Sequence, residues 1–322
     1  MPSAIPPALC FHMVSRLLRP AALLLAIGTL PAAQAAPPSG SQAATTKTVA
    51  IDEAHKNTHS FSTPSFRGLV ELLQSEGFRV QPFSVAVTAI ALKGIDVLLI
   101  SGPGGWLTAA DSLTGREVDQ LLQWIRGGGS LLLILDHMPA PAHAVLLTKA
   151  LGISEWHDGY VLVKMPDSNL ISPIVFWRSD TLPANAPATG PTGPGGGRGY
   201  QGADAVLARH PITDGRRADE RVQRVATFGG SAFRPPKDAE VLLTLPGGAL
   251  SFIPPPIPNQ VPVMTEQTPR VDVGGWAQGA VLRIGRGRVA VFGETGLFSG
   301  GPAADNRVFL LNLMRWLSGL LK

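Results

Sequence analysis

Acidic residues and histidines stand directly after several apolar segments of this 322-residue chain. Aspartate, glutamate and histidine are the side chains that most often transfer protons, bind metals or bind hydroxyl groups in proteins. In an open sheet of parallel strands, ligands bind beyond the carboxyl ends of the strands. The segments therefore predict one polar rim, made of Asp52, Glu53, His55, Asn57, His59, Asp136, His137 and Glu294.

The first hypothesis for this rim is a site that binds a small polar, sugar-like ligand or a protein of the cell envelope. The predicted ligand-binding residues are Asp52, Glu53, His55, Asn57, His137 and Glu294. A second hypothesis is a hydrolase in which Asp136 and Glu294, on neighbouring strands, are the two catalytic carboxylates. Both acids could equally be structural. No serine lies in a GxSxG context, so the nucleophile turn of α/β-hydrolases is absent.

A divalent metal is the cofactor that the rim would take in a metal-assisted hydrolase. Its predicted ligands are His55, His59, Asp136 and His137, with Glu294 as a base. The first and fourth strands are expected two steps apart, or about 10 Å. The segment with both His55 and His59 must then fold over the sheet edge to reach Asp136. Otherwise these histidines are ordinary polar residues of the rim.

The order of the apolar segments predicts an α/β fold with a doubly wound, mostly parallel, flavodoxin-like sheet. We expect strands at 48–51, 78–83, 95–101, 130–135 and 289–292, in the spatial order second, first, third, fourth, last. Helices are expected from Pro64 to Gly77 and at 84–92, 114–126, 143–151 and 305–320. Thr114, with Glu117 three residues later, predicts a capping box.

The second half of the domain follows a different pattern, which predicts an irregular β-rich insertion at about 159–279. Strands are expected at 222–228, 239–245 and 280–284. The segment at 183–202 is dominated by Pro, Gly, Ala and Thr, and it has too few apolar side chains to order itself. We therefore expect a mobile loop there.

The first 36 residues have the pattern of a secretory signal peptide. Arg16 and Arg19 precede an apolar run at 21–30, and small residues end at Ala35. The run is shorter than the roughly 20 residues that span a bilayer, so we expect no transmembrane anchor after cleavage. A linker at 37–46 and the α/β domain at 47–322 follow. The protein is expected in the periplasm or outside the cell, with translation starting at Met1 or Met13.

Charge and cysteine content exclude two classes of function. The net charge is only +4, and the basic residues are scattered rather than gathered along one stripe, so nucleic acid is not an expected partner. The one cysteine, Cys10, precedes the apolar run of the leader, so the mature chain has no thiol. Nucleophilic cysteine chemistry is thereby excluded.

Four stretches of the chain resemble a known group of proteins. They are 52–57, 128–136, 285–294 and 305–317, with the middle third unmatched. This combination is similar to uncharacterised exported bacterial proteins that carry a class I glutamine amidotransferase-like domain of unknown function, and to auxiliary domains of gliding-motility transporters. The resemblance implies an amidotransferase-like scaffold with a pocket at Asp52, His55, Asp136, His137 and Glu294.

The same resemblance also marks a departure. Working amidotransferases place a cysteine nucleophile in the turn after a central strand. Here that turn reads Leu135, Asp136, His137, Met138 and Pro139, so glutaminase activity by that route is not expected. A binding module in the cell envelope is therefore the leading expectation, and the metal-assisted hydrolase is the alternative.

Overall fold

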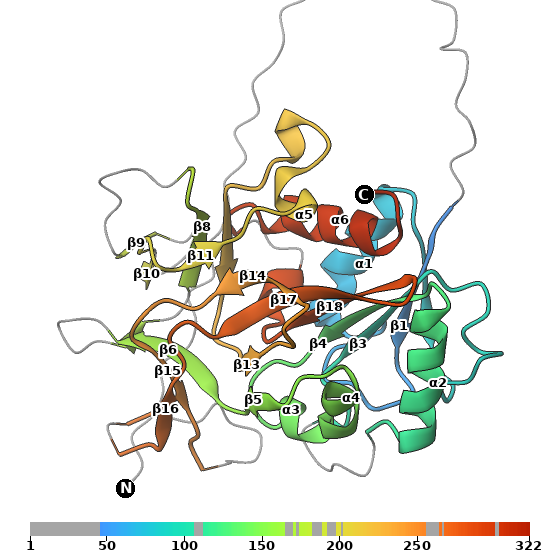
Figure 1. Ribbon diagram of the computed structural model, residues 1–322, viewed down its shortest axis with the longest axis horizontal. Helices are drawn as coiled ribbons and strands as arrows, with labels where there is room; N and C mark the ends of the chain where they lie inside the picture. Colours follow the sequence, from blue (N-terminus) through green and yellow to red (C-terminus); the bar gives the residue numbers. More distant parts are fainter. Residues whose placement is uncertain are drawn as a thin grey trace, which may run out of the picture. The chain divides into compact units, whose positions relative to one another are not determined.

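The computed structural model describes most of the chain after residue 45 (Figure 1). The described residues are 46–105, 112–164, 170–171, 174–181, 189–191, 198–200, 202–255, 264–265, 267–299 and 303–322. The predicted signal peptide and nearly all of the predicted linker lie outside these ranges. None of the helices within them is both long and apolar enough to cross a membrane.

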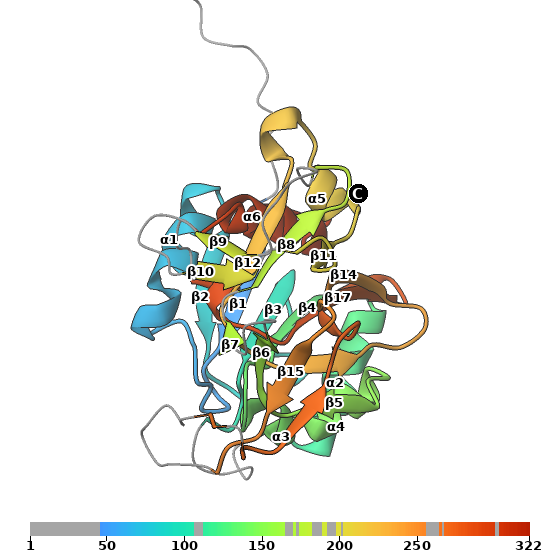
Figure 2. The ribbon, with the colours of Figure 1, turned by 90° about the vertical axis from the view of Figure 1, so that its left-hand side faces the viewer.

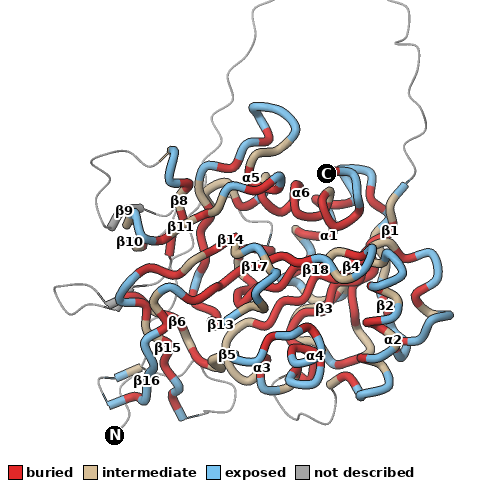
Figure 3. The backbone as a smooth tube through the Cα atoms, viewed as in Figure 1, coloured by how far each residue is buried: buried red, intermediate tan, exposed pale blue. Residues whose placement is uncertain are grey.

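Five parallel strands form the centre of the fold, in the order β2-β1-β3-β4-β18. They are β1 (Thr48–Asp52), β2 (Arg79–Phe83), β3 (Val97–Ser101), β4 (Ser130–Ile134) and β18 (Gly287–Phe292). Every residue of β1, β3 and β4 is buried, as the continuous apolar runs require of strands that are covered on both faces (Figure 3). The predicted strand order is confirmed.

Helices cover both faces of this sheet, which confirms the doubly wound α/β fold (Figure 1). Side chains alternate along each strand, so Val49 packs with α1 and α6 while Ala50 packs with α2. The helices longer than four residues are α1 (Arg67–Ser75), α2 (Gly115–Arg126), α4 (Val145–Ala150) and α6 (Asn306–Leu317). The shorter ones are η1 (Pro64–Phe66), α3 (Ala140–His143), α5 (Pro211–Asp214), η3 (Ala218–Glu220) and η4 (Gly296–Phe298).

Of two predictions about helices, the capping box of α2 is confirmed and the helix at 84–92 is wrong. The capping box at the start of α2 is present, because the Thr114 side chain accepts from the backbone N–H of Glu117 and the Glu117 side chain accepts from that of Thr114. The predicted helix at 84–92 is wrong, since this connection forms only turns. There the backbone N–H of Val87 donates to Glu117 Oε1 at 3.1 Å. The segment is therefore tied to the cap of α2, and its turn is closed by the backbone N–H of Leu92, which donates to the Thr88 carbonyl at 3.0 Å.

The insertion extends the sheet beyond β18 with antiparallel and mixed strands (Figure 2). The extension runs through β17 (Ala277–Ile284), β14 (Glu240–Thr244), β11 (Val206–Leu207), β8 (Ile174–Arg178), β10 (Arg198–Tyr200) and β9 (Thr189–Pro191). Beside it pair β5 (Glu155–His157), β12 (Arg224–Thr227) and β13 (Ala232–Arg234). A separate sheet contains β16 (Arg270–Asp272), β15 (Ala249–Phe252), β6 (Tyr160–Lys164) and β7 (Leu170–Ile171).

The predicted mobile loop at 183–202 contains two of these strands, β9 and β10, which pair with each other, and β10 also pairs with β8. Backbone hydrogen bonds supply the order that its few apolar side chains cannot. Most of the remainder of this segment lies outside the described residues.

Strand β2 forms one margin of the parallel sheet. It is the least buried of the five strands, with Arg79 and Pro82 exposed. Pro82 lies opposite Ile51 of β1 and has no N–H to donate on its other side.

Candidate functional site

The carboxyl ends of β3, β4 and β18 meet at one edge of the sheet. The register pairs Ile134 with both Ser101 and Phe292. Asp136 comes two residues after Ile134, and Glu294 comes two residues after Phe292. The structure thus brings these two acids to the ends of adjacent parallel strands.

The segment between β1 and η1 folds over the end of β3. The backbone N–H of Thr58 donates to the Gly102 carbonyl at 2.9 Å, and that of Gly104 donates to the His55 carbonyl at 2.8 Å. Gly102 has φ +59, and a Cβ there would lie 2.8 Å from Thr58 Oγ1. This close crossing therefore requires glycine, and it carries His59 towards β4.

His55 lies on the other side of this segment, between two carboxylates. Its Nδ1 is 2.8 Å from Asp52 Oδ2, and its Nε2 is 3.0 Å from Glu117 Oε1. Burial opposes the charged ring, but hydrogen bonds and negative charge from Asp52 and Glu117 raise the pKa of His55 to about 9. The protonated histidine thus ties β1 to the cap of α2, and both of its nitrogens are used.

Asn57 and Glu53 are bonded within the same segment. Asn57 Nδ2 donates to Asp52 Oδ2 at 2.7 Å, and Asn57 Oδ1 accepts from the backbone N–H of Ser101 at 3.2 Å. Glu53 accepts from the backbone and hydroxyl of Ser62. Four of the six predicted ligand-binding residues, Asp52, Glu53, His55 and Asn57, therefore hold the loop. Glu117, which completes their network, was predicted as part of the capping box but not as a residue of the site.

A cleft of about 490 Å³ opens beside this segment at the ends of β4 and β18. It falls within the size range of small-molecule sites, which is about 300–1,000 Å³. The cleft is lined by Thr58, His59, Thr63, Pro64, Ser65, Gly102, Asp136, His137, Pro139, Ala140 and Thr295. Three of the predicted residues, His59, Asp136 and His137, thus share it.

Asp136 and His137 are held in place by local contacts. Asp136 Oδ1 accepts from the backbone N–H of His137 at 2.9 Å, and His137 Nδ1 lies 3.0 Å from the Met138 carbonyl. The His137 ring stacks on Tyr160, with centroids 4.1 Å apart. Tyr160 begins β6, so the insertion supports one wall of the cleft.

His59 is paired with a serine. Its Nδ1 lies 2.7 Å from Ser65 Oγ, and its ring stacks on the buried Phe66 at 5.6 Å between centroids. Burial lowers the pKa of His59, while the negative charge of Asp136 opposes that shift. The ring is therefore neutral near pH 7.

Glu294 lies behind the cleft rather than on its surface. It is 3% exposed, and its two oxygens accept from the backbone N–H groups of Gly296 at 2.7 Å and Leu297 at 2.8 Å. Burial and the charge of Asp136 raise its pKa, against the effect of these backbone donors. Glu294 shapes the turn into η4 and interacts with Asp136 through charge.

Within the described part of the chain, Thr295 Oγ1 and Asp158 Oδ1 are buried polar atoms near the cleft without a hydrogen-bond partner. Thr295 Oγ1 lines the cleft while the residue is only 6% exposed. Asp158 Oδ1 lies next to the strand that carries Tyr160, and burial raises the pKa of Asp158 to about 6. Buried polar atoms in proteins are nearly always bonded, so unbonded ones indicate positions for a ligand or a water.

The predicted metal quartet is not assembled. Across the part of the chain that the structure describes, no three His, Cys, Asp or Glu side chains are grouped so that they could hold a metal ion. The physical reason is that His55 and His59 have different partners. Both ring nitrogens of His55 are bonded to Asp52 and Glu117, while His59 bonds Ser65.

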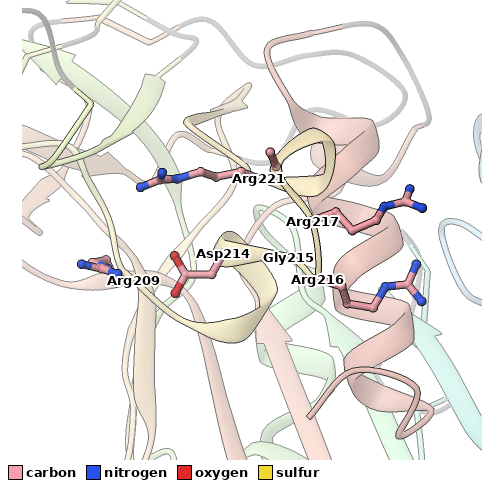
Figure 4. Close-up of a pocket in the computed structure, with 7 residues that line it drawn as sticks. Arg209, Asp214, Gly215, Arg216, Arg217 and Arg221 are labelled. Atoms are coloured by element: carbon pink, nitrogen blue, oxygen red, sulfur yellow. The ribbon is translucent and has the colours of Figure 1, made fainter.

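A second hollow, of about 330 Å³, contains several arginines (Figure 4). Arg216 and Arg217 point to one side of it, and Arg209 and Arg221 point to the other. Three of them are paired, Arg216 with Glu220, Arg217 with Asp219 and Arg221 with Asp180. Because the guanidinium groups diverge and are largely neutralised, this hollow is a salt-bridged surface and not a convergent anion site.

Comparisons with known proteins agree with the fold. No family profile and no curated protein matches the chain. Among solved structures, the mmIFT52 N-terminal domain is similar with a TM-score of 0.52 and 16% identity over 85% of this chain and 97% of that one. A ThuA-like protein from Bacteroides uniformis has a TM-score of 0.47 and 14% identity over 88% and 95%. A cytoplasmic protein from Salmonella typhimurium has 0.42 and 14% over 84% and 98%.

At such low identity the first of these similarities shows the fold alone, and the other two add no argument about this chain. The chain is an α/β protein.

Proposed function

We propose that this protein binds a small, hydroxyl-rich ligand, such as a monosaccharide or disaccharide, in the cleft at the ends of β4 and β18. The observation that carries the proposal is the wall of this cleft. It combines the carboxylate of Asp136, the imidazoles of His59 and His137, and the unpartnered hydroxyl of Thr295.

The chemistry of the wall fits a sugar better than a charged or an apolar molecule. A carboxylate accepts two hydroxyl hydrogen bonds at once, and imidazoles and hydroxyls both donate and accept. Pro64, Pro139 and Ala140 supply apolar surface for the C–H face of a ring. The His59 ring is neutral near pH 7, so it offers no positive charge to a strongly anionic ligand.

The cellular setting is part of the same proposal. The leader pattern of the first 36 residues supports export, and the amidotransferase-like resemblance supports a scaffold that has lost its cysteine chemistry. We propose that binding takes place in the cell envelope, where sugars and envelope proteins are both present.

Calorimetric titration of the purified protein with a panel of neutral monosaccharides and disaccharides tests the proposal. At least one sugar is expected to bind, and at one hundred times its dissociation constant it stabilises the fold by about 2.7 kcal/mol. Asp136→Asn, which keeps the shape but removes the charge, is expected to weaken binding by about 10-fold or more. Asp219→Asn, at the exposed ion pair of the arginine hollow, is the matched control and leaves affinity unchanged. Absence of heat and of stabilisation with every sugar contradicts the proposal.

A further inference from the structure

The cleft contains a serine that faces a histidine base. Ser65 Oγ and His59 Nδ1 are 2.7 Å apart, which is a short distance for a hydrogen bond between a hydroxyl and an imidazole, and both residues line the cleft. Such a pair is the minimal arrangement for activating a hydroxyl as a nucleophile. Ser65 is the second residue of η1, so this arrangement differs from the GxSxG turn, which the sequence lacks.

The ring of His59 is fixed in the orientation that the pair needs. The fully buried Phe66 stacks against the ring, and the backbone segment that carries His59 is hydrogen-bonded across the end of β3. Because burial keeps the ring neutral, it is able to accept a proton. The nearby negative charge of Asp136 stabilises the imidazolium that results.

Ser65 has one other neighbour. Its Oγ also donates to Thr63 Oγ1 at 3.2 Å, while the proton of Thr63 goes to the Ser60 carbonyl at 2.8 Å. The contact with His59 is the shorter by half an ångström and involves the more basic acceptor. The proton of Ser65 thus has two acceptors within reach, and His59 Nδ1 is the nearer of them.

We propose that Ser65 is the nucleophile, and His59 the general base, of an ester-hydrolysing site whose substrates are small O-acyl esters of hydroxyl-rich molecules. The substrate class rests on the sugar binding proposed above, whereas the Ser65–His59 pair stands without it. The buried hydroxyl of Thr295 is the donor that the cleft offers to the carbonyl oxygen.

The reaction balances in two steps. Ser65 Oγ attacks the ester carbonyl while its proton moves to His59 Nδ1, and the bond from the carbonyl carbon to the alcohol oxygen breaks as that proton passes to the leaving alcohol. Water then attacks the acyl-serine, gives one proton to His59, and releases the carboxylic acid as the serine recovers its proton. No oxidant, reductant or metal is needed.

Labelling of the full protein with a fluorophosphonate probe, followed by peptide mass spectrometry, tests the nucleophile. The expected result is one phosphonylated residue, Ser65, together with hydrolysis of p-nitrophenyl acetate. Ser65→Ala is expected to abolish the label and to lower hydrolysis by at least about 100-fold. Ser62→Ala is the matched control, because Ser62 is also exposed but bonds Glu53 outside the cleft, and it keeps both activities.

A second variant separates the base from a folding defect. His59→Ala is expected to lose labelling, and added imidazole should restore it in part, which a merely unfolded protein would not allow. An unlabelled wild type, or equal labelling of Ser65→Ala and wild type, overturns the inference. Labelling of Ser65 without binding of any sugar refutes only the ligand class, and sugar binding without labelling refutes only the catalytic step.

Discussion

Two histidines of one loop, His55 and His59, illustrate two uses of the same residue type at the same sheet edge. His55 bonds Asp52 and Glu117 through both ring nitrogens and is inaccessible. His59 bonds a single exposed serine and lines a cleft. The difference lies in the completeness of the hydrogen bonding and not in the sequence pattern around them.

The number of hydrogen-bond partners inside the protein therefore distinguishes a structural polar cluster from one that is able to bind a ligand. In the His55 network each charged group has its partners inside the protein, so little bonding capacity remains for a ligand. In the cleft, Thr295 Oγ1 remains without a partner and Asp136 faces the open volume. Three variants test this distinction.

The largest expected effect is the loss of stability in His55→Ala. The substitution leaves the carboxylates of Asp52 and Glu117 buried without their cation, which costs about 3–5 kcal/mol. His59→Ala is the control from the same loop and costs about 1 kcal/mol, because it loses a hydrogen bond to an exposed serine and leaves no buried charge without its partner. Urea unfolding followed by circular dichroism measures both. Equal losses in the two variants would contradict the distinction.

The next effect is a dependence of stability on pH that belongs to the His55 network. The pKa of His55 is raised from 6.5 to about 9, so its stabilisation is complete below pH 6.5 and disappears as the pH rises through about 9. The pKa of Glu117 is lowered from 4.5 to about 2, so its stabilisation is complete above pH 4.5 and disappears as the pH falls through about 2.

The free energy of unfolding of wild type minus that of His55→Gln should therefore be largest between pH 4.5 and 6.5. Urea titrations across this range and up to pH 10 give that difference directly. A difference that stays constant from pH 6.5 to pH 10 would show that the ring is not protonated in the folded protein.

The smallest expected effect is in Thr295→Val, which removes an unpartnered hydroxyl without changing the shape of the side chain. Stability should stay the same or rise by up to about 1 kcal/mol, since a buried unbonded group is unfavourable. Thr227→Val is the matched control, because Thr227 is equally buried but donates to Gln278 at 2.7 Å. It should lose about 1–3 kcal/mol in thermal or urea unfolding. A comparable loss in Thr295→Val would mean that its hydroxyl is bonded.

Much of the central fold was predictable because its signals are local. Continuous apolar runs identified β3 and β4, and Thr114 with Glu117 identified the start of α2. The predicted helix at 84–92 was wrong in a segment whose backbone at Val87 is bonded to Glu117, 30 residues further along the chain. In the insertion, β9 and β10 were missed because backbone pairing orders them without an apolar pattern.

The site was predictable only as a location. The sequence placed Asp136, His137 and His59 at the strand ends, where the structure also has them. It could not distinguish His55 from His59, because the partner that removes His55 from the site is Glu117, 62 residues away. The serine facing His59 carried no recognisable motif, and Tyr160 reaches His137 from the insertion.

The exposed margin at β2 has a consequence for how these molecules behave in concentrated solution. A neighbouring molecule that tried to continue the sheet there would meet Pro82, which offers no N–H, and would have to cover the charge of Arg79. Copies of the chain are thereby discouraged from pairing strand to strand along this side, even though every residue of the neighbouring strand β1 is buried.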